Sequence, residues 1–576
     1  MAQPFRLMAH NGELNTDRKN RLSDEALAQA SNRSIVRPPG QSDSSRLDQT
    51  LQSRVFDDDL DIVEAVVTLM PPAWENDAML SQPVRDMLEY FSLYEEKNDG
   101  PAALIFHDGD VVGARLDRLG LRPLRTVETN DYLMVSSEAG QLHVADDDVT
   151  HRGRIEAGGM LSLDHRTGKI RRTKDILEEL SSRRDYGALL GEARVHIDQL
   201  AVEGTRGTTT LGYGGDLSLA GRYVAYSLNQ ESFRFMMDPM LAAGAERISA
   251  MGYGNAINAL SDQEGGLAKY FSQRFAQVTN PPLDSIRESD SMTFRVALGA
   301  KPDGTGRPTK QIVVDSPILG QLEMLRLREQ TVTPLERFDV LYTPDPVDAE
   351  ANAAALVAAL DHVCDGVEAF ARTTGGIAVL TDRGIDSQHA PIPLLLAIAA
   401  VNQRLIAQGL RLRVSLVAES GQLPSSHHIA AALGFGASAV YSLSARLRAE
   451  EKYPAGSAPA TVETDTDRAF ARFRKAALKS LGKTMGRVGL CTVESYIGGE
   501  FFEPNYLDTR DPVLARCFPH MAAPVGGVGF LRIATAATEW HESACHVETE
   551  KQIPLLGLFK ERSEGAGHSY GMTAVR

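Results

Sequence analysis

The sequence predicts a multidomain chain with an α+β first half and an α/β second half. Up to about residue 190, short apolar runs bounded by Gly and Asp are typical of antiparallel hairpins. From residue 352 onward, patterns of buried strands and helices alternate, which predicts right-handed crossovers and a parallel sheet. The length of 576 residues is too great for one ordinary domain and indicates two to four.

In the first half, three runs predict the hairpins: "AALIFHDGDVVGARLD", "DYLMVSSEAG" and "GGMLSLDHRTGKI". Two helical patterns interrupt them, at about 57–70 and 82–96. The first of these helices is expected to begin with Asp57, Asp58 and Asp59, whose charges suit the positive end of a helix dipole.

Residues 200–345 are less regular, and we expect helical patches there at 267–277 and 334–340. Beyond them the βαβ rhythm predicts a series of elements in order: helix 354–372, strand 375–382, helix 393–410, strand 413–420, helix 427–436 and strand 437–443. A basic amphipathic helix at about 468–486 is expected to pack on a surface.

Composition and charge exclude several classes of protein. The formal net charge of −16 argues against non-specific nucleic-acid binding, which needs clustered Lys and Arg. No apolar run approaches the roughly 20 residues that span a bilayer, and the first residues do not resemble a signal peptide. The four cysteines, none close to another in sequence, predict buried free thiols in a cytoplasmic protein without a zinc or iron–sulfur site of its own: Cys364, Cys491, Cys517 and Cys545.

The stretch "AHNGELNT" at residues 9–16 has two interpretations. An Asn-Gly pair most often forms a hairpin turn, because both residues tolerate positive φ. The side-chain amide of Asn11 and the backbone N–H of Gly12 could instead donate two hydrogen bonds to one developing oxyanion. The local sequence leaves both open.

The stretch "GQSDSSRLDQTL" at residues 40–51 also has two interpretations. A Ser-Asp-Ser turn before an apolar-periodic run is typical of a helix N-cap. Asp43 could also bind the ammonium group of an amino-acid substrate through a charge-assisted hydrogen bond.

Polar residues follow the predicted parallel strands, where ligands often bind. Asp382, Arg383 and Glu419 could face a ligand there or form a structural ion pair. The adjacent histidines His427 and His428 open a helix, and neighbours on a helix point about 100° apart. We therefore expect packing roles for them rather than a shared metal.

Several longer stretches, taken together and in order, resemble a known family. "PFRLMAHNGELNT", "SDSSRLD", "DGPAALIFHDGDVVGARLDRLGLRPLR" and "SSEAG" resemble the glutamine amidotransferase domain of the glutamate synthase large subunit, of the class with an N-terminal cysteine nucleophile. Five further stretches resemble the central domain of the same subunit: "FSQRFAQVTNPPLDSIRE", "VVDSPIL", "LTDRGIDSQHAPIPLLLAIAAV", "VSLVAESGQLPSSHHIAAALGFGASAV" and "LGKTMGRVGLCTVESYIGGEFFE". The resemblance covers nearly the whole chain.

The resemblance implies three regions. Residues 1–195 would be the C-terminal part of an N-terminal-nucleophile αββα sandwich. Residues 196–510 would be the α/β central domain, and residues 511–576 a connecting segment towards an FMN-binding β/α barrel.

The implied reaction converts glutamine and 2-oxoglutarate to two glutamates, and ammonia moves between two sites. Asn11 and Gly12 would form the oxyanion hole, and Asp43 would hold the α-ammonium of glutamine. FMN and an iron–sulfur cluster belong to the complete enzyme, with no residue of this chain assigned to either. The reductant would come from an NAD(P)H-oxidising small subunit or from ferredoxin; no nucleic acid or membrane partner is expected.

The sequence also departs from the family pattern. Residue 1 is Met and the first cysteine is Cys364, so the N-terminal cysteine nucleophile is missing, as is the sequence of the barrel. We expect the isolated chain to be inactive as a glutaminase and to be colourless. Three hypotheses follow: part of a glutamate synthase, a non-catalytic scaffold of this family, or a glutamine-binding protein that uses Asp43 without hydrolysis.

Overall fold

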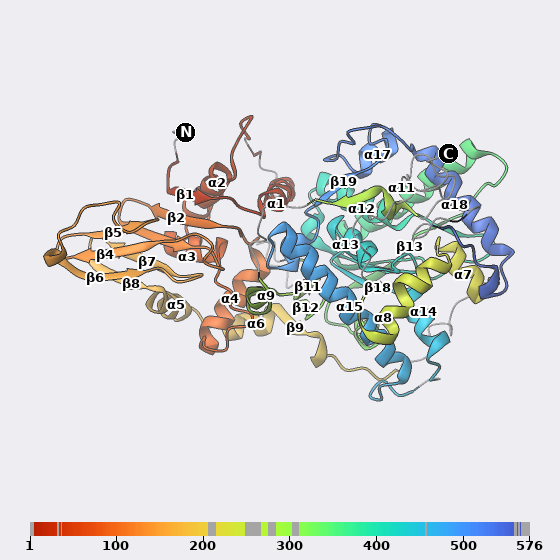
Figure 1. Cartoon of the computed structure of the whole chain (residues 1–576), viewed down its shortest axis with the longest axis horizontal. Coiled ribbons are helices and arrows are strands. Elements are labelled where there is room, and N and C mark those ends of the chain that lie inside the picture. The colour runs from red at the N-terminus through yellow and green to blue at the C-terminus, as the bar shows by residue number, and fades with distance from the viewer. Residues whose placement is uncertain are drawn as a thin grey trace.

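The computed structural model has two parts that lie side by side along its longest axis (Figure 1). We refer to residues 5–193 as the N-terminal part and to residues 194–557 as the C-terminal part. The structure describes residues 5–30, 34–35, 37–204, 215–247, 266–274, 284–301, 310–455, 458–557, 562 and 565.

The N-terminal part contains two antiparallel sheets and a layer of helices. Its larger sheet has the order β1-β2-β3-β7-β8 and its smaller sheet the order β5-β4-β6. Its elements are β1 (Met8–Gly12), α1 (Asp17–Ala30), α2 (Asp43–Phe56), α3 (Ile62–Leu69), α4 (Gln82–Tyr94), β2 (Ala102–His107), β3 (Val111–Leu116), β4 (Arg125–Thr129), β5 (Leu133–Ser136), β6 (Val149–Arg154), β7 (Met160–Asp164), β8 (Lys169–Arg172), α5 (Thr173–Ser181) and α6 (Tyr186–Ala193).

Alternation along β2 separates two hydrophobic cores. Leu104 and Phe106 face helices α2 to α5, whereas Ala103 and Ile105 face the smaller sheet. Successive side chains of a strand point to opposite faces, so β2 contributes to both cores. The described residues thus form a helix–sheet–sheet arrangement, and the predicted α+β class with antiparallel hairpins is confirmed.

The β2–β3 and β7–β8 hairpins occur where the sequence predicts them. The helix predicted at 57–70 begins later, because Asp61 is its N-cap and accepts hydrogen bonds from the N–H groups of Val63 and Glu64. The expectation that Asp57, Asp58 and Asp59 begin this helix is wrong. Asp57 is instead the C-cap residue of α2.

The C-terminal part is built around a parallel sheet with the order β13-β15-β17-β18. Its elements are β9 (Arg194–His196), α7 (Leu219–Ala225), α8 (Asp238–Ala243), β10 (Phe271–Gln273), α9 (Ser285–Ser291), β11 (Val296–Leu298), β12 (Gln311–Val314), α10 (Gln321–Glu329), β13 (Leu335–Asp339), β14 (Leu341–Tyr342), α11 (Ala349–Thr373), β15 (Gly376–Thr381), β16 (Ala390–Pro391), α12 (Leu394–Ala407), β17 (Val414–Ser420), α13 (Ser426–Gly434), β18 (Ala439–Ser442), α14 (Leu443–Lys452), α15 (Asp465–Val488), α16 (Val493–Tyr496), β19 (Phe502–Pro504), α17 (Pro512–Cys517) and α18 (Phe530–Cys545).

The predicted βαβ units are confirmed. All residues of β15 and β17 are buried, as expected for central strands of a parallel sheet. Helices α11, α12 and α13 connect the strands at the predicted positions and pack on β13, β17 and β18, respectively.

Three expectations in this part are wrong. Within the stretch 334–340, residues Leu335–Asp339 form the edge strand β13, not a helix, because the half-exposed run "LERFD" pairs with β15. In the stretch 267–277, a short 3-10 helix, Leu267–Tyr270, leads into strand β10, and residues 275–277 lie outside the described residues. Helix α15 buries an apolar face against α8, α13 and α14, so it lies in the core and not merely on a surface.

The predicted domain limits fall within packed structure. β9 crosses the limit at 195 and pairs with β12 of the C-terminal part. Within the predicted connecting segment, α17 and α18 pack on α12, α11 and α7, and their apolar side chains join the main core. These residues therefore belong to the C-terminal part.

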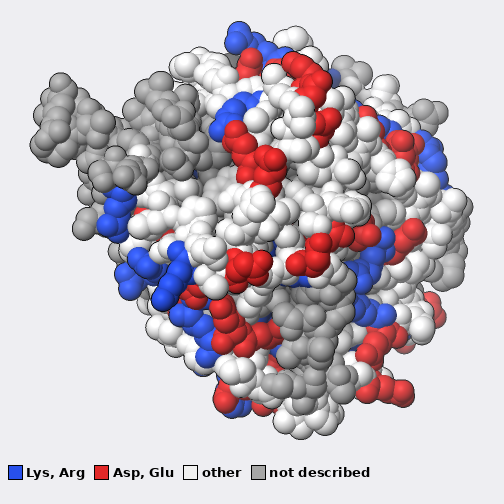
Figure 2. Space-filling view, turned by 90° about the vertical axis from the view of Figure 1, so that its right-hand side faces the viewer, with Lys and Arg blue, Asp and Glu red and all other residues white. Residues whose placement is uncertain are grey.

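Surface charge is mixed at the end of the molecule formed by the C-terminal part, where acidic and basic side chains intersperse (Figure 2). A field of mixed sign does not attract a polyanion. Among the described residues, no helix has the length and apolar character needed to cross a membrane.

Candidate functional site

Asn11 and Gly12 are the last two residues of β1, an edge strand of the larger sheet. They pair with Ala103 and Ala102 of β2, and the N–H of Glu13 continues the ladder by donating to the carbonyl of Pro101 over 2.9 Å. The hairpin-turn interpretation of this Asn-Gly pair is therefore wrong: both residues belong to a strand.

The side chain of Asn11 is available for binding. It is exposed, and its amide makes no hydrogen bond within the described part of the chain. Its partner across the ladder is Ala103, and residues that pair directly share one face of a sheet. The amide therefore projects from a rigid strand as a free donor.

Gly12 is required by the close approach of the neighbouring chain. A Cβ atom at this position would lie 1.9 Å from the carbonyl oxygen of Pro101, which is far inside contact distance. Residue 12 must therefore be a glycine, and its backbone, which carries no side chain, lies next to Asn11 in the strand.

Helix α2 holds β1 at both ends through two carboxylates. Ser42 is its N-cap and accepts from the N–H of Ser45 over 3.2 Å, which confirms the capping interpretation of this turn. Asp43 Oδ2 accepts the N–H of Leu14 over 2.8 Å, and Asp48 Oδ1 accepts the N–H of Leu7 over 2.9 Å. Asp43 therefore lies at the end of β1, where it contacts the chain two residues beyond Gly12.

His10 and Ser44, to which the sequence analysis assigned no role, lie beside Asp43. His10 Nδ1 is 2.7 Å from Ser44 Oγ, and its Nε2 is buried without a hydrogen-bond partner in the described residues. Burial lowers the pKa of His10 and nearby Arg122 lowers it further, whereas Asp43 opposes this. A neutral imidazole with one unsatisfied nitrogen is thus part of the site. The alternation of β1, which turns His10 towards α2, was the available signal.

The polar residues after the parallel strands form closed networks. Glu419 is fully buried, and its oxygens accept from Arg328 and Arg383 over 2.6 Å and from Arg337 over 3.2 Å. The arginines lower the pKa of Glu419 to about 2 against the effect of burial, which alone would raise it. The structural ion-pair interpretation fits these contacts, and the sequence did not indicate Arg328 or Arg337.

Asp382 lies beside this network but has neutral partners. It accepts hydrogen bonds from Ser420 Oγ, from the N–H of Gly421 and from Gln422 Nε2, over 2.5, 2.9 and 3.1 Å. Burial raises the pKa of its carboxyl to about 6.

The two adjacent histidines pack separately. His427 Nε2 is 2.9 Å from the carbonyl oxygen of Ala268, and His428 Nδ1 is 2.8 Å from Ser425 Oγ. Burial lowers the pKa of both, to about 3 for His428. These contacts match the expected packing roles.

Three of the four cysteines are buried, whereas Cys545 is only partly so, which corrects the expectation for that residue. Cys517 lies near Cys364, and burial raises their pKa values to about 12 and 11. Cys491 instead faces Asp99. The one group with metal-binding geometry in the described ranges is His196, Asp198 and Asp315, within 4.8 Å of one another at the surface, and Arg326 already pairs with Asp198.

Comparison with protein families assigns both parts of the chain. Residues 1–189 match the class-II glutamine amidotransferases, and residues 221–506 match the glutamate synthase central domain. The chain belongs to the glutamate synthase family. The resemblance found in the sequence is thereby confirmed.

Individual relatives support this membership. The chain is 32% identical to the NADH glutamate synthase of Schizosaccharomyces pombe, over 98% of its own length and 28% of the relative. It is 30% identical to the NADPH glutamate synthase large chain of Bacillus subtilis, over 100% of its own length and 37% of the relative. The chloroplastic ferredoxin-dependent enzyme of Oryza sativa subsp. japonica is also 30% identical, with 99% and 36% covered. The chain thus spans about a third of the length of these relatives.

Proposed function

We propose that this chain supplies amidotransferase and central portions of a glutamate synthase large subunit. The whole reaction would convert glutamine, 2-oxoglutarate and reductant to two glutamates. The observation that carries the proposal is the arrangement at the end of β1, where the free Asn11 amide adjoins the Gly12 backbone and the Asp43 carboxylate accepts the N–H of Leu14, two residues further along, in a region that matches the amidotransferases.

In the glutaminase half-reaction, attack on the amide carbon of glutamine develops negative charge on the carbonyl oxygen. The Asn11 amide and the Gly12 N–H would donate hydrogen bonds to that oxygen. Asp43 accepts from the N–H groups of Leu14 and Ser44, and a carboxylate has about four acceptor sites, so it keeps capacity for an ammonium group. Arg122, which lies near His10 and whose buried Nε has no partner among the described residues, would supply positive charge for the substrate carboxylate.

The nucleophile of this reaction is not among the four cysteines of the chain. Cys364, the first in sequence, is buried in the C-terminal part, and burial raises its pKa to about 11. A thiol rather than a thiolate at neutral pH is a poor nucleophile. The isolated chain is therefore expected to release no ammonia from glutamine above background.

The central portion would line the ammonia path and hold the two active sites in register. An ion pair across the junction supports its rigidity: Lys97 reaches Glu494 over 3.4 Å, and Glu75 of the N-terminal part holds Lys97 over 3.3 Å. Glu89 of the N-terminal part additionally contacts Arg194 and Arg295.

FMN and an iron–sulfur cluster would bind elsewhere in the complete enzyme. A cluster needs several thiolates around one centre, whereas only Cys364 and Cys517 lie near each other and Cys491 lies beside Asp99, so the thiols of this chain do not fit one. A purified chain is accordingly expected to have no flavin absorbance band. The names of the relatives include NADH, NADPH and ferredoxin, so the electron donor stays open. Unpaired cysteines favour a cytoplasmic location.

The test is a fusion of this chain to the N-terminal, cysteine-bearing segment of the Bacillus subtilis relative. We expect the fusion to release ammonia from glutamine, and Asn11→Ala to lower that rate by about 10²–10³. Arg6→Gln is the control, since Arg6 precedes the other end of β1 and its guanidinium stacks on Phe56. A folded fusion without activity, or one indifferent to Asn11→Ala, would contradict the proposal.

A second candidate is a non-catalytic scaffold or glutamine-binding protein. The hydrogen bonds that Asp43 accepts from two backbone N–H groups favour this candidate, because they give Asp43 a structural role that needs no catalysis. Calorimetric titration with glutamine separates the readings. A glutamine-binding protein is indicated if the chain binds glutamine, if Asp43→Asn abolishes this binding and if the fusion does not hydrolyse glutamine. No affinity at all indicates a scaffold.

A further inference from the structure

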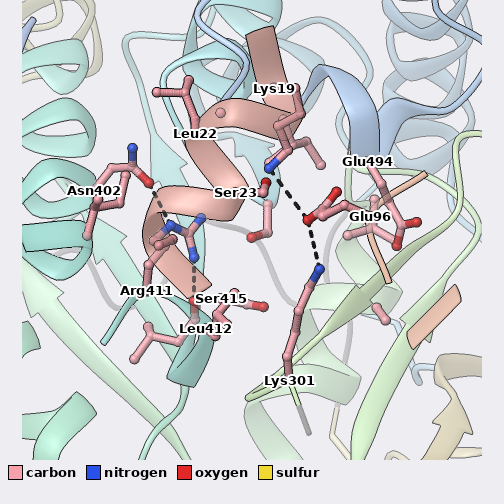
Figure 3. A pocket seen from close by; sticks show the side chains of 18 of the residues that line it. Lys19, Leu22, Ser23, Glu96, Lys301, Asn402, Arg411, Leu412, Ser415 and Glu494 are labelled. Carbon is pink, nitrogen blue, oxygen red and sulfur yellow. Dashed lines mark hydrogen bonds and ion pairs between the residues drawn. The ribbon is translucent and has the colours of Figure 1, made fainter. Parts of the chain in front are cut away.

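A cavity of about 100 Å³ lies at the junction of the two parts, away from the end of β1. Helix α1 and Glu96 of the N-terminal part form one wall, and Lys301, α12 and the turn before β17 form the other. Figure 3 shows Arg411 on one side of this cavity, and on the opposite side Glu96 between Lys19 and Lys301.

Positive charge exceeds negative charge around this cavity. Glu96 Oε1 is shared by Lys301 Nζ at 2.9 Å and Lys19 Nζ at 3.7 Å. Glu494 also lines the cavity and pairs with Lys97, which is not a lining residue. With Arg411, three lining cations face two lining carboxylates, which leaves one positive charge.

Arg411 carries that excess charge. Its guanidinium donates to Asn402 Oδ1 over 2.6 Å and to the carbonyl oxygens of Val414 and Gly436 over 2.6 and 2.9 Å. All three acceptors are neutral, and no carboxylate bonds to Arg411 among the described residues. A charge without a counter-charge inside a protein is costly, and a bound anion would relieve that cost.

Burial disfavours the charged forms of Arg411 and Lys19, and in the case of Lys19 the neighbouring cations add to this effect. Burial lowers the pKa of Arg411 to about 10, and Glu96 only partly opposes this. Burial likewise lowers the pKa of Lys19, and Lys301 and Arg411 lower it further despite Glu96.

The rest of the lining is mostly apolar, and the hydroxyls of Ser23 and Ser438 make no hydrogen bond within the described residues. Leu22, Ile406 and Leu412 contribute aliphatic surface. A ligand that matches these walls has one negative head and a short aliphatic body. Inorganic phosphate lacks the aliphatic body.

We propose that this cavity binds a small organic monocarboxylate. Its carboxylate would contact Arg411 and the Ser23 hydroxyl, and its aliphatic end would lie against Leu22 and Ile406. Because Ser23 and Leu22 belong to α1 whereas Arg411 and Ile406 belong to the C-terminal part, the ligand bridges the two parts and stabilises their junction.

The test uses the full chain with butyrate as the probe, and with inorganic phosphate and the neutral butanol as comparisons. Calorimetry should give saturable binding of butyrate alone, and the thermal midpoint should rise with butyrate concentration. Arg411→Gln should weaken butyrate binding at least about tenfold, because a charge-assisted hydrogen bond is lost. Arg413→Gln is the matched control: it lies on the same turn but donates outside the cavity, to the carbonyl of Arg372.

Ser23→Leu keeps every charge and fills the cavity, so it tests the site even if Arg411→Gln fails to fold. It should abolish butyrate binding. Equal binding of butanol would overturn recognition by charge, and preferential binding of phosphate would overturn the carboxylate class. Butyrate binding that survives both variants, or no binding by the wild-type chain, would overturn the site itself.

Discussion

The parallel sheet and the larger antiparallel sheet both carry polar residues at strand ends, and they differ in how the hydrogen-bonding groups of those residues are satisfied. At the carboxyl ends of β15 and β17, Asp382 and Glu419 are fully buried and accept hydrogen bonds at both oxygens. At the end of β1, the Asn11 amide is exposed and His10 Nε2 has no partner among the described residues. A closed network stabilises the fold, whereas free donors and acceptors are what a substrate requires. Residue type alone does not distinguish these cases.

Glu419→Gln should produce the largest loss of stability, about 3–5 kcal/mol, because it leaves Arg328, Arg337 and Arg383 around a neutral group. Urea unfolding measures it. Glu539→Gln, which breaks an exposed pair with Arg532, should change stability by about 1 kcal/mol or less. A small effect of Glu419→Gln would show that the network is open to solvent and that the contrast between the strand ends is false.

Asp382 should make stability depend on pH. Its folded pKa of about 6 lies above the unfolded value of 3.8, so the folded state holds the proton more tightly. This stabilisation is complete below the unfolded pKa and is lost as pH rises through 6, a change of about 3 kcal/mol. Asp382→Asn, which mimics the protonated acid, should remove this loss.

The measurement compares urea unfolding of wild type and Asp382→Asn at about pH 4 and about pH 7. The exposed Asp465→Asn is the control and should leave the pH dependence as in wild type. Parallel pH curves for wild type and Asp382→Asn would mean that the pKa of this carboxyl is the same in the folded and unfolded states.

Gly12→Ala should destabilise the N-terminal part by about 1–3 kcal/mol, because its Cβ would clash with the carbonyl of Pro101. Gly191→Ala is the matched control, since a Cβ there meets no atom within 4 Å and should be neutral or stabilising by up to about 1 kcal/mol in α6. Equal effects of the two changes, seen by thermal unfolding, would show that the end of β1 is not fixed by the sheet.

Asn11→Ala should have the smallest effect on stability, within about 0.5 kcal/mol, since the side chain is exposed and makes no hydrogen bond in the described residues. The same substitution should strongly lower the rate of glutamine hydrolysis by the fusion. A clear loss of stability, measured by urea unfolding, would turn Asn11 into a structural residue.

The sequence by itself determined the βαβ half, the hairpins and the family. Short apolar runs such as β15 and β17, bounded by Gly or polar residues and alternating with helical patterns, indicate buried strands, and the family motifs taken together and in order identify the family without any coordinates. Tertiary structure alone decided that residues Leu335–Asp339 form an edge strand and that Asn11 and Gly12 extend a sheet. In both cases pairing with a distant strand outweighed a weak local preference.

The partners of charged groups were likewise decided by tertiary structure. Asp43 meets Leu14, and Glu419 meets Arg328, across 29 and 91 positions of sequence. Arg411 lies at a junction that forms only when the two parts pack together. Such contacts depend on the position of whole elements, which local pattern does not encode, so a sequence can indicate which residues carry charge but not which charges remain unpaired.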